Sequence, residues 1–325
     1  MSFQTRFKVY DPNAVKRDEL MGVIFDIERF AIHNGPGIRT LVFFKGCNVK
    51  CNWCHNPESY HDQPEIVRIT EKCIGCGTCV QKCKGNCLSS NWSPGKAPVI
   101  EREKCLMPNC GFCSTVCYSD AITVSGRYLT IAEVMEEVER DREFYGRTGG
   151  GVTFSGGEPM AQPVFLEALA RESKNRGLDT ALETCGGAPW TAFQSVLKFI
   201  NTVIYDLKHM DSDKHREYTG IPNSMILENL RLIDSLGIPI RIRMPLMPGF
   251  NDSDDHIQAT AVFVSSLKNL QALDIYPYHR MCEPKWEHLG IYNEKHGMPP
   301  HPMEAVRRLA QVARDFGIEV TVGGV

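Results

Sequence analysis

The sequence lacks any run of about 18 apolar residues, the length that a membrane-spanning helix requires. Its first 20 residues, MSFQTRFKVYDPNAVKRDEL, are polar and lack the apolar stretch of a signal peptide. Neither sign of charge is in excess, because 36 Lys and Arg stand against 39 Asp and Glu. This balance argues against the basic surface that nucleic-acid binding requires. We therefore expect a soluble cytoplasmic protein that binds neither a membrane nor nucleic acid.

Cysteine, in contrast, is abundant, with 14 residues in a chain of 325. A short secreted protein would use so many cysteines for disulfides, but this chain has no export signal. Metal ligation explains the pattern better, and iron-sulfur thiolates would make the protein oxygen-sensitive and suited to an anaerobic cell. Eleven of the 14 cysteines fall into three tight groups: Cys47, Cys51, Cys54; Cys73, Cys76, Cys79, Cys83; and Cys105, Cys110, Cys113, Cys117.

The first group has the spacing Cys-x3-Cys-x2-Cys and directly follows the apolar segment Leu41 to Phe44, which reads as a buried strand. A cubane iron-sulfur cluster normally takes four cysteines, so three of them leave one iron open to a small molecule. Two alternatives are a structural zinc loop, which usually needs two ligand pairs, and buried free thiols. His55 is in principle a fourth ligand.

The segment GPGIRTLVFFKGCNVKCNWCHNP, residues 35–57, resembles the glycyl-radical-enzyme activating enzymes of the radical S-adenosylmethionine (SAM) superfamily. The resemblance implies a partial parallel (β/α)6 barrel whose active site lies at the carboxyl ends of its strands. It also implies that SAM chelates the open iron and is cleaved by one electron. The resulting 5′-deoxyadenosyl radical would take a hydrogen atom from a glycine of a partner glycyl radical enzyme.

The other two cysteine groups resemble the runs of a two-cluster bacterial ferredoxin, where the fourth cysteine of each run ligates the other cluster. Lys84 stands where ferredoxins usually have proline, and Cys87 is an alternative fourth ligand. We favour Cys83 because Cys87 aligns with the small buried residue Ala121 of the second run. The alternative is that these cysteines form a pair of structural zinc-binding knuckles. The crossed ligand sets are Cys73, Cys76, Cys79, Cys117 and Cys105, Cys110, Cys113, Cys83.

These assignments predict three 4Fe-4S clusters and divide the chain into three parts. An N-terminal arm of residues 1–21 has no readable role. Residues 22–60 and 129–325 would form the barrel, and residues 61–128 an inserted ferredoxin-like α+β domain. After Thr130, an N-cap with Glu133 at the capping-box position, helices and strands alternate as a parallel sheet requires. The first of these helices should end before Gly146, and the expected strands span 149–154, 178–184, 202–207, 238–244, 272–277 and 318–322.

Polar motifs follow several of these strands, where a parallel barrel gathers its active site. Glycines at a strand end allow a close backbone approach, and Asp206 with Lys208 would offer SAM both charge signs. A surface ion pair is the alternative for these two. The resemblance implies that Gly156, Gly157 and Glu158 bind the amino group of SAM, and it carries SAM contact onto Asp206, Leu207 and Lys208.

Other candidates flank the same site. We expect Lys208 and Arg243 to act in catalysis with the cluster cysteines, although Arg243 is equally explained as a salt-bridged structural residue. The resemblance places His279 at the SAM ribose, and Trp53 and His55 beside the adenine. The alternative for His279 is a hydrogen-bonded core histidine, and the alternative for Trp53 and His55 is a partly buried Trp that anchors the loop by packing. It also implies that Glu183 and Thr184 help to hold a monovalent cation, although the family member concerned has aspartate instead of glutamate.

Cys185 and Cys282 lack motif partners and are expected to be packing thiols. The resemblance further implies an electron donor such as flavodoxin or ferredoxin, while no motif names the glycyl radical enzyme that is served. One rival interpretation is a radical SAM enzyme that uses auxiliary clusters to modify another protein side chain or a small molecule. Another is an electron-transfer protein in which the Cys47 loop holds a third relay cluster.

Overall fold

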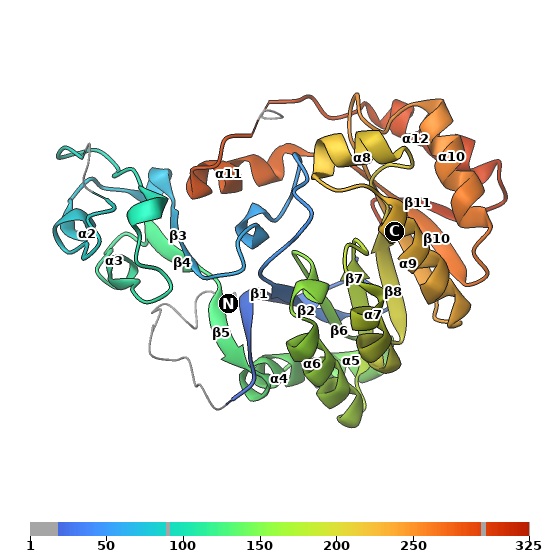
Figure 1. Ribbon diagram of the computed structural model, residues 1–325, viewed down its shortest axis with the longest axis horizontal. Coiled ribbons are helices and arrows are strands. Elements are labelled where there is room, and N and C mark those ends of the chain that lie inside the picture. The colour runs from blue at the N-terminus through green and yellow to red at the C-terminus, as the bar shows by residue number, and fades with distance from the viewer. Residues whose placement is uncertain (1–18, 89–91, 294–296, 325) are drawn as a thin grey trace.

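The computed structural model describes residues 19–88, 92–293 and 297–324 (Figure 1). Nearly all of the predicted N-terminal arm, residues 1–18, lies outside the described residues. The main body is a nine-stranded sheet in the order β11-β10-β9-β8-β7-β6-β2-β1-β5. The small insert stands beside this body and carries a two-stranded sheet, β3-β4.

Seven neighbouring strands of the large sheet run parallel, and six of them are longer than three residues. The predicted partial barrel of the radical SAM type is therefore confirmed. Its described edges are β11 and β5, which do not pair with each other. The parallel strands are β2 (Arg39–Phe44), β6 (Gly151–Gly156), β7 (Asp179–Thr184), β8 (Thr202–Asp206), β9 (Ile240–Leu246), β10 (Leu270–Pro277) and β11 (Val320–Val322).

Two strands extend the sheet beyond β2 in the antiparallel sense: β1 (Met21–Ala31) pairs with β2, and β5 (Arg127–Thr130) pairs with β1. The insert therefore lies in the long connection from β2 to β6. Because β5 already belongs to the large sheet, the predicted domain boundary at residues 128 and 129 falls inside this strand. Insert and barrel are thus joined through a strand of the sheet rather than through a free linker.

Helices pack on the sheet and bury their apolar residues in one continuous core with the strands. The predicted N-cap is confirmed, since Thr130 and Glu133 form a capping box at the start of α4. The helices of the large domain are α4 (Ile131–Glu139), α5 (Arg142–Thr148), α6 (Pro163–Asn175), α7 (Trp190–Val196), α8 (Ser212–Thr219), α9 (Ser224–Ser235), α10 (Asp254–Ser265), α11 (Glu283–Leu289) and α12 (Met303–Arg314).

The helix that begins after Thr130 ends before Gly146, as predicted, because α4 stops at Glu139. The sequence did not predict the second helix, α5, which begins after Asp141 and runs through Gly146. Asp141 is fully buried, and its carboxylate accepts hydrogen bonds from Thr40 Oγ1 at 2.8 Å and from Arg29 Nε at 2.9 Å. These tertiary contacts outweigh the local helical pattern, while Gly146 faces open space where it costs about 1 kcal/mol relative to alanine.

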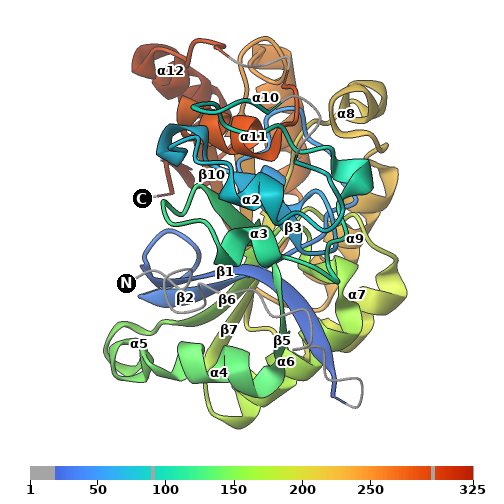
Figure 2. The same cartoon turned by 90° about the vertical axis from the view of Figure 1, so that its left-hand side faces the viewer.

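The insert has the predicted ferredoxin-like character. Its strands β3 (Glu65–Arg68) and β4 (Ile122–Ser125) pair antiparallel, and two one-turn helices, α2 (Thr78–Gln81) and α3 (Phe112–Thr115), start at glycines within the two cysteine runs. Ile66, Leu88 and Ile122 form a small core together with the cysteines. Viewed from its own side, the insert places α2 and α3 at the front of the molecule (Figure 2).

Candidate active site

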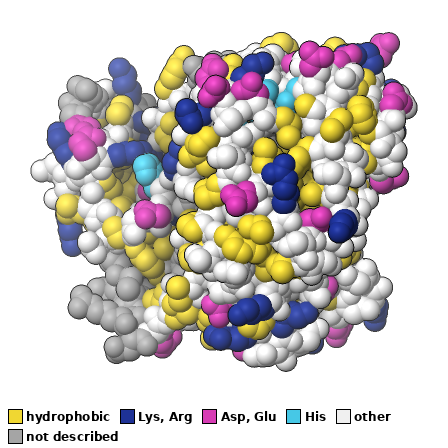
Figure 3. Space-filling view, turned by 45° about the vertical axis from the view of Figure 1, so that its right-hand side comes forward, with side chains coloured by type: hydrophobic (Ala, Val, Ile, Leu, Met, Phe, Trp, Pro, Cys, Tyr) yellow, Lys and Arg dark blue, Asp and Glu magenta, His cyan; other side chains and the backbone are white. Residues whose placement is uncertain are grey.

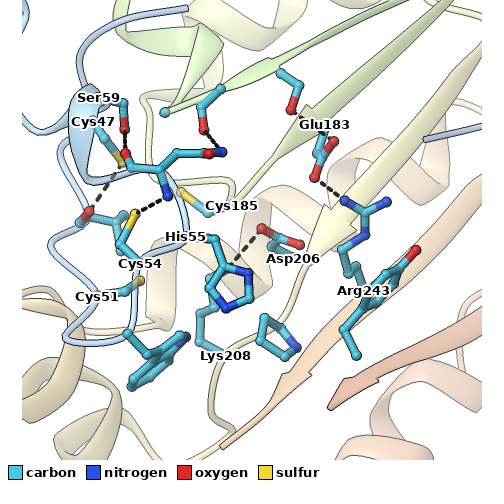
Figure 4. Close-up of a pocket in the computed structure, with 18 of the residues that line it drawn as sticks. Cys47, Cys51, Cys54, His55, Ser59, Glu183, Cys185, Asp206, Lys208 and Arg243 are labelled. Atoms are coloured by element: carbon cyan, nitrogen blue, oxygen red, sulfur yellow. Dashed lines mark hydrogen bonds and ion pairs between the residues drawn. The ribbon is translucent and has the colours of Figure 1, made fainter. Parts of the chain in front are cut away.

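The loop after β2 lines a cavity of about 500 Å³ at the carboxyl ends of the parallel strands (Figure 4). Cys47, Cys51 and Cys54 all reach this cavity, as the spacing predicts. Burial raises the pKa of Cys51 to about 12, and it also raises the pKa of Cys54 well above the ordinary value of a thiol. Thiols in such surroundings stay protonated unless a nearby cation stabilises the thiolate, as a bound metal does.

Hydrogen bonds hold the cysteine loop from its outer side. Tyr60 donates its hydroxyl to the Cys51 carbonyl at 2.6 Å, and Trp286 Nε1 donates to the Cys54 carbonyl at 3.0 Å. The rings of Tyr60 and Trp286 meet edge to face at 5.2 Å. Two neighbouring turns of the loop are thus held by one aromatic pair, while the three cysteine side chains line the cavity.

A fourth cysteine, Cys185, also lines this cavity, although no motif indicated a role for it. It is buried at the end of β7, where its thiol donates to the Glu158 carboxylate at 2.9 Å. The interaction with the neighbouring Cys185 side chain lowers the pKa of Cys47. The expectation of a packing thiol therefore misses these polar contacts. Only the spacing of Cys185 after Glu183-Thr184, at a strand end, could have signalled its position.

Gly156 and Gly157 reach the cavity, but the close approach that they permit is to the chain itself. A Cβ on Gly156, which has a φ of +112°, would lie 2.5 Å from the Phe44 nitrogen. A Cβ on Gly157 would lie 2.3 Å from the Gly46 carbonyl oxygen. The two glycines therefore seat the start of the cysteine loop against the end of β6.

Two predicted SAM-contacting residues do not line the cavity. Glu158 is 1 % exposed, and its carboxylate accepts hydrogen bonds from the Met160 amide, the Thr184 hydroxyl and the Cys185 amide at 2.8 to 3.0 Å. Leu207 is buried, with its amide donating to the Arg243 carbonyl. Glu158 thus shapes the cavity from behind its wall.

Asp206 and Lys208 lie on the cavity wall as a partly buried pair, with Lys208 Nζ 2.8 Å from Asp206 Oδ2 (Figure 4). Burial alone would lower the pKa of Lys208, but the Asp206 carboxylate outweighs it and the pKa is raised. The pair is therefore not an outward-facing surface pair. Asp206 Oδ1 is buried and has no hydrogen-bond partner among the described residues.

Arg243 also lines the cavity and forms an ion pair with Glu183 (Figure 4). Its guanidinium lies 4.6 Å from the centre of the Tyr276 ring and donates to the His33 carbonyl at 3.0 Å. Arg243 Nε, however, is buried without a partner in the described part of the chain. The residue therefore has the contacts of a structural arginine together with one unused donor.

The Glu183 carboxylate is already engaged by several donors. Besides Arg243, it accepts hydrogen bonds from Ser155 Oγ at 2.9 Å and from Asn34 Nδ2 at 2.8 Å. Thr184 in turn donates to Glu158. The two residues expected to help hold a monovalent cation thus line the cavity with their oxygens turned to protein donors or acceptors.

The aromatic candidates also line the cavity. The rings of His55 and His279 are 4.3 Å apart, and burial together with His279 lowers the pKa of His55 to about 4. Trp53 is 4 % exposed and packs on Phe250 at 4.6 Å between ring centres. Trp53 therefore anchors the cysteine loop by packing, which was the structural alternative for this residue, and it also lines the cavity.

The residues present fit a cluster with one open coordination site and a bound SAM. Three cysteines reach the cavity from one loop, which is one fewer than a fully ligated cubane uses. Two buried polar atoms on the wall, Asp206 Oδ1 and Arg243 Nε, lack partners within the described residues and could be satisfied by a polar ligand. The cavity volume lies within the range of about 300 to 1,000 Å³ that small-molecule sites occupy.

In the insert, the cysteines surround two small cavities in the crossed pattern. One cavity is lined by Cys73, Cys76, Cys79 and Cys117. The other is lined by Cys105, Cys110, Cys113, Cys83 and also Cys87, whose sulfur lies 3.3 Å from that of Cys83. Among the described residues, no three His, Cys, Asp or Glu side chains lie close enough together to bind a single metal ion. In a cubane cluster each cysteine binds a different iron, so the four sulfur atoms need only line one cavity and need not meet at one point.

Helix α11 joins the insert to the cysteine loop, and nothing in its short sequence signalled this. At one end Lys285 pairs with Glu58 at 3.0 Å and Trp286 contacts the loop. At the other end His288 lies 3.0 Å from Glu71, and Arg102 Nε donates to the Leu289 carbonyl at 2.9 Å. Glu71 and Arg102 lie in the turns that directly precede Cys73 and Cys105. The helix therefore contacts all three cysteine groups or their immediate neighbours.

Outside the site, the surface carries charges of both signs interspersed over the face in Figure 3. No helix among the described residues combines the length and the apolar character that crossing a membrane demands.

Comparison with known proteins independently supports the resemblance to radical SAM enzymes. A model of the radical SAM superfamily matches residues 105–261, and a model of the 4Fe-4S binding domain matches residues 66–89. The first match begins inside the insert and omits the Cys47 loop. Relatives that align over most of the chain are therefore more informative about the family.

Three such relatives are curated activating enzymes. The isethionate sulfite-lyase activating enzyme of Nitratidesulfovibrio vulgaris is 42% identical over 82% of this chain and 87% of its own. The choline trimethylamine-lyase activating enzyme of Oleidesulfovibrio alaskensis is 36% identical over 94% of this chain and 98% of its own. The 4-hydroxyphenylacetate decarboxylase activating enzyme of Clostridioides difficile has the same identity and coverage.

These relatives favour the activating enzyme over both rival interpretations, since each is named for the enzyme that it activates. The identities and coverage together show the family without recourse to the motif alone. The chain therefore belongs to the glycyl-radical-enzyme activating enzymes of the radical SAM superfamily.

Proposed function

We propose that this enzyme holds three 4Fe-4S clusters and binds SAM in the cavity beside the Cys47 loop. The observation that carries this proposal is the gathering of Cys47, Cys51 and Cys54 with the Asp206–Lys208 pair around one cavity. The two remaining clusters would occupy the insert with the crossed ligand sets. An anaerobic cytoplasm suits such clusters, because exposed iron-sulfur thiolates oxidise readily.

Cys47, Cys51 and Cys54 would hold the cluster, which would supply the electron that breaks the sulfonium carbon-sulfur bond of SAM. The chain's own residues orient SAM and exclude water. Asp206 Oδ1 has a free acceptor position for a SAM hydroxyl or ammonium, and Arg243 Nε has a free donor position for a SAM oxygen. Around them, the buried Trp53 and the more exposed rings of His55 and His279 form an aromatic wall suited to a nucleoside.

The substrate of the resulting radical is a glycine in a partner glycyl radical enzyme. The relatives above are named for lyases and a decarboxylase, so the partner of this chain is an enzyme of one of those kinds or of a related one. We further propose that an external carrier such as flavodoxin or ferredoxin feeds electrons through the insert. The contacts of α11 with Cys54 and with both preceding turns of the insert support this relay.

The experiment that tests the function combines the reduced anaerobic protein with SAM and purified candidate glycyl radical enzymes. We expect 5′-deoxyadenosine, measured by liquid chromatography, together with a glycyl radical signal in the electron paramagnetic resonance spectrum of one candidate. 5′-Deoxyadenosine without a glycyl radical on any candidate would instead favour a radical SAM enzyme with another substrate.

The crossed ligand sets predict different results for two neighbouring cysteines. Cys83→Ala should lose the iron of one auxiliary cluster, because Cys83 is the proposed fourth ligand of the Cys105 group. Cys87→Ala should keep all its iron, because Cys87 is expected to pack as a small apolar residue. Iron and sulfide analysis of the two purified variants checks this prediction, with the double variant as the reference for complete loss. Loss of iron in Cys87→Ala but not in Cys83→Ala would reverse the assignment.

A further inference from the structure

Two exposed lysines lie at the opening of the second cysteine cavity of the insert. Lys82 and Lys84 flank Cys83, are exposed, and both line the cavity of the Cys105 group. Neither forms an ion pair with an acidic side chain among the described residues, whereas the nearby Lys104 pairs with Glu101. Exposed lysines without partners keep their full charge available for an approaching molecule.

Apolar side chains complete the rim of the same cavity. Leu106 is 50% exposed and Phe112 is 44% exposed, and both line it together with the two lysines. Exposed apolar residues ringed by charge are typical of an interaction surface. We call the set Lys82, Lys84, Leu106 and Phe112 the rim patch.

The other cysteine cavity of the insert differs in charge. The residues that line the cavity of Cys73, Cys76, Cys79 and Cys117 include no Lys, Arg, Asp or Glu. Residues 61–128 as a whole contain eight Lys and Arg and six Asp and Glu, although the full chain has a net charge of −3. Positive charge is thus placed at one of the two openings and not at the other.

We propose that the rim patch is the docking surface for the acidic face of a one-electron carrier protein. The carrier would lose one electron and the iron-sulfur group beneath the patch would gain it, with no bond or proton exchanged. Charge complementarity selects the acidic partner, and the apolar pair gives the contact a dry centre. This inference rests on the proposed function, because it requires a cluster held by the Cys105 group and Cys83.

The test compares two reductants of the holoenzyme, reduced acidic flavodoxin and dithionite, by the rate of 5′-deoxyadenosine formation. The K82E/K84E variant should need at least about tenfold more flavodoxin for half-maximal rate, and this rate should lose most of its salt dependence. Dithionite is a small molecule that needs no protein docking surface, so its rate should change less than about twofold. The matched control is K198E/K268E, which reverses two exposed lysines of the barrel and should behave as wild type with both reductants.

An unchanged flavodoxin requirement in K82E/K84E with full iron content would overturn the docking surface. Wild-type protein that forms no 5′-deoxyadenosine with dithionite would instead overturn the proposed function. Should charge reversal reduce the iron content, K82Q/K84Q replaces it, and a requirement raised about threefold is then expected from the lost positive charges. No increase in that variant would also overturn the proposal.

Discussion

Replacing Cys47, Cys51 and Cys54 together by alanine abolishes the formation of 5′-deoxyadenosine while the insert keeps its iron. All three sulfur atoms line the cavity proposed for SAM, and no residue of the insert is changed. The small core of the insert contains its own cysteines with Ile66 and Leu88, so it should fold and load clusters independently of the loop. Iron analysis and chromatography of the reaction products measure the two effects.

Cys185→Ala is the matched control for this prediction, because Cys185 lines the same cavity and is as buried as Cys51. Its thiol is turned to Glu158, so the variant should keep the iron content of the wild type and still cleave SAM. If the triple variant retained SAM cleavage, or if Cys185→Ala lost one cluster's iron, the assignment of the three loop cysteines as the ligand set would be wrong.

Arg243→Gln lowers the rate of SAM cleavage by a factor on the order of 10² or more, well beyond the effect of Glu183→Gln. Both changes replace the Glu183–Arg243 ion pair by a weaker hydrogen bond, and each should reduce the free energy of unfolding by roughly 1 to 3 kcal/mol. Only the arginine change, however, also removes the buried Nε that has no partner in the described structure.

The comparison of these two variants separates the two interpretations of Arg243. Single-turnover rates with dithionite measure cleavage, and thermal denaturation under argon measures stability. Equal losses of rate and of stability in both variants would show that Arg243 serves only to neutralise Glu183. A selective loss of rate in Arg243→Gln would show that its guanidinium acts on the bound SAM.

The regular parts of the fold could be predicted because they depend on local patterns. Runs of apolar residues followed by Gly, Asp or Pro predicted the parallel strands to within two residues at most ends. The exact break between α4 and α5 could not be predicted, because it depends on contacts of Asp141 with Thr40 and Arg29, which lie on strands distant in the sequence. Such contacts leave no signal in the helix itself.

In the candidate site, too, local sequence patterns could be interpreted and contacts between distant residues could not. Cysteine spacing indicated which sulfur atoms share a cavity, since a run of ligands must fold around one cluster. The segment Gly156-Gly157-Glu158 was less informative, because the Glu158 carboxylate accepts hydrogen bonds from Thr184 and Cys185 rather than facing the cavity. The role of Trp286 could not be predicted, because its contact with the Cys54 carbonyl joins residues separated by 232 positions.

The central claim is that one iron at the Cys47 loop has no protein ligand and binds SAM. Electron-nuclear double resonance on the reduced protein, with SAM carrying a magnetic isotope in its amino or carboxylate group, tests this most directly. We predict coupling of both labelled groups to the cluster, and no coupling in the triple cysteine variant. Absence of coupling in the wild type, with His55 or Cys185 found as a fourth ligand instead, would contradict the account.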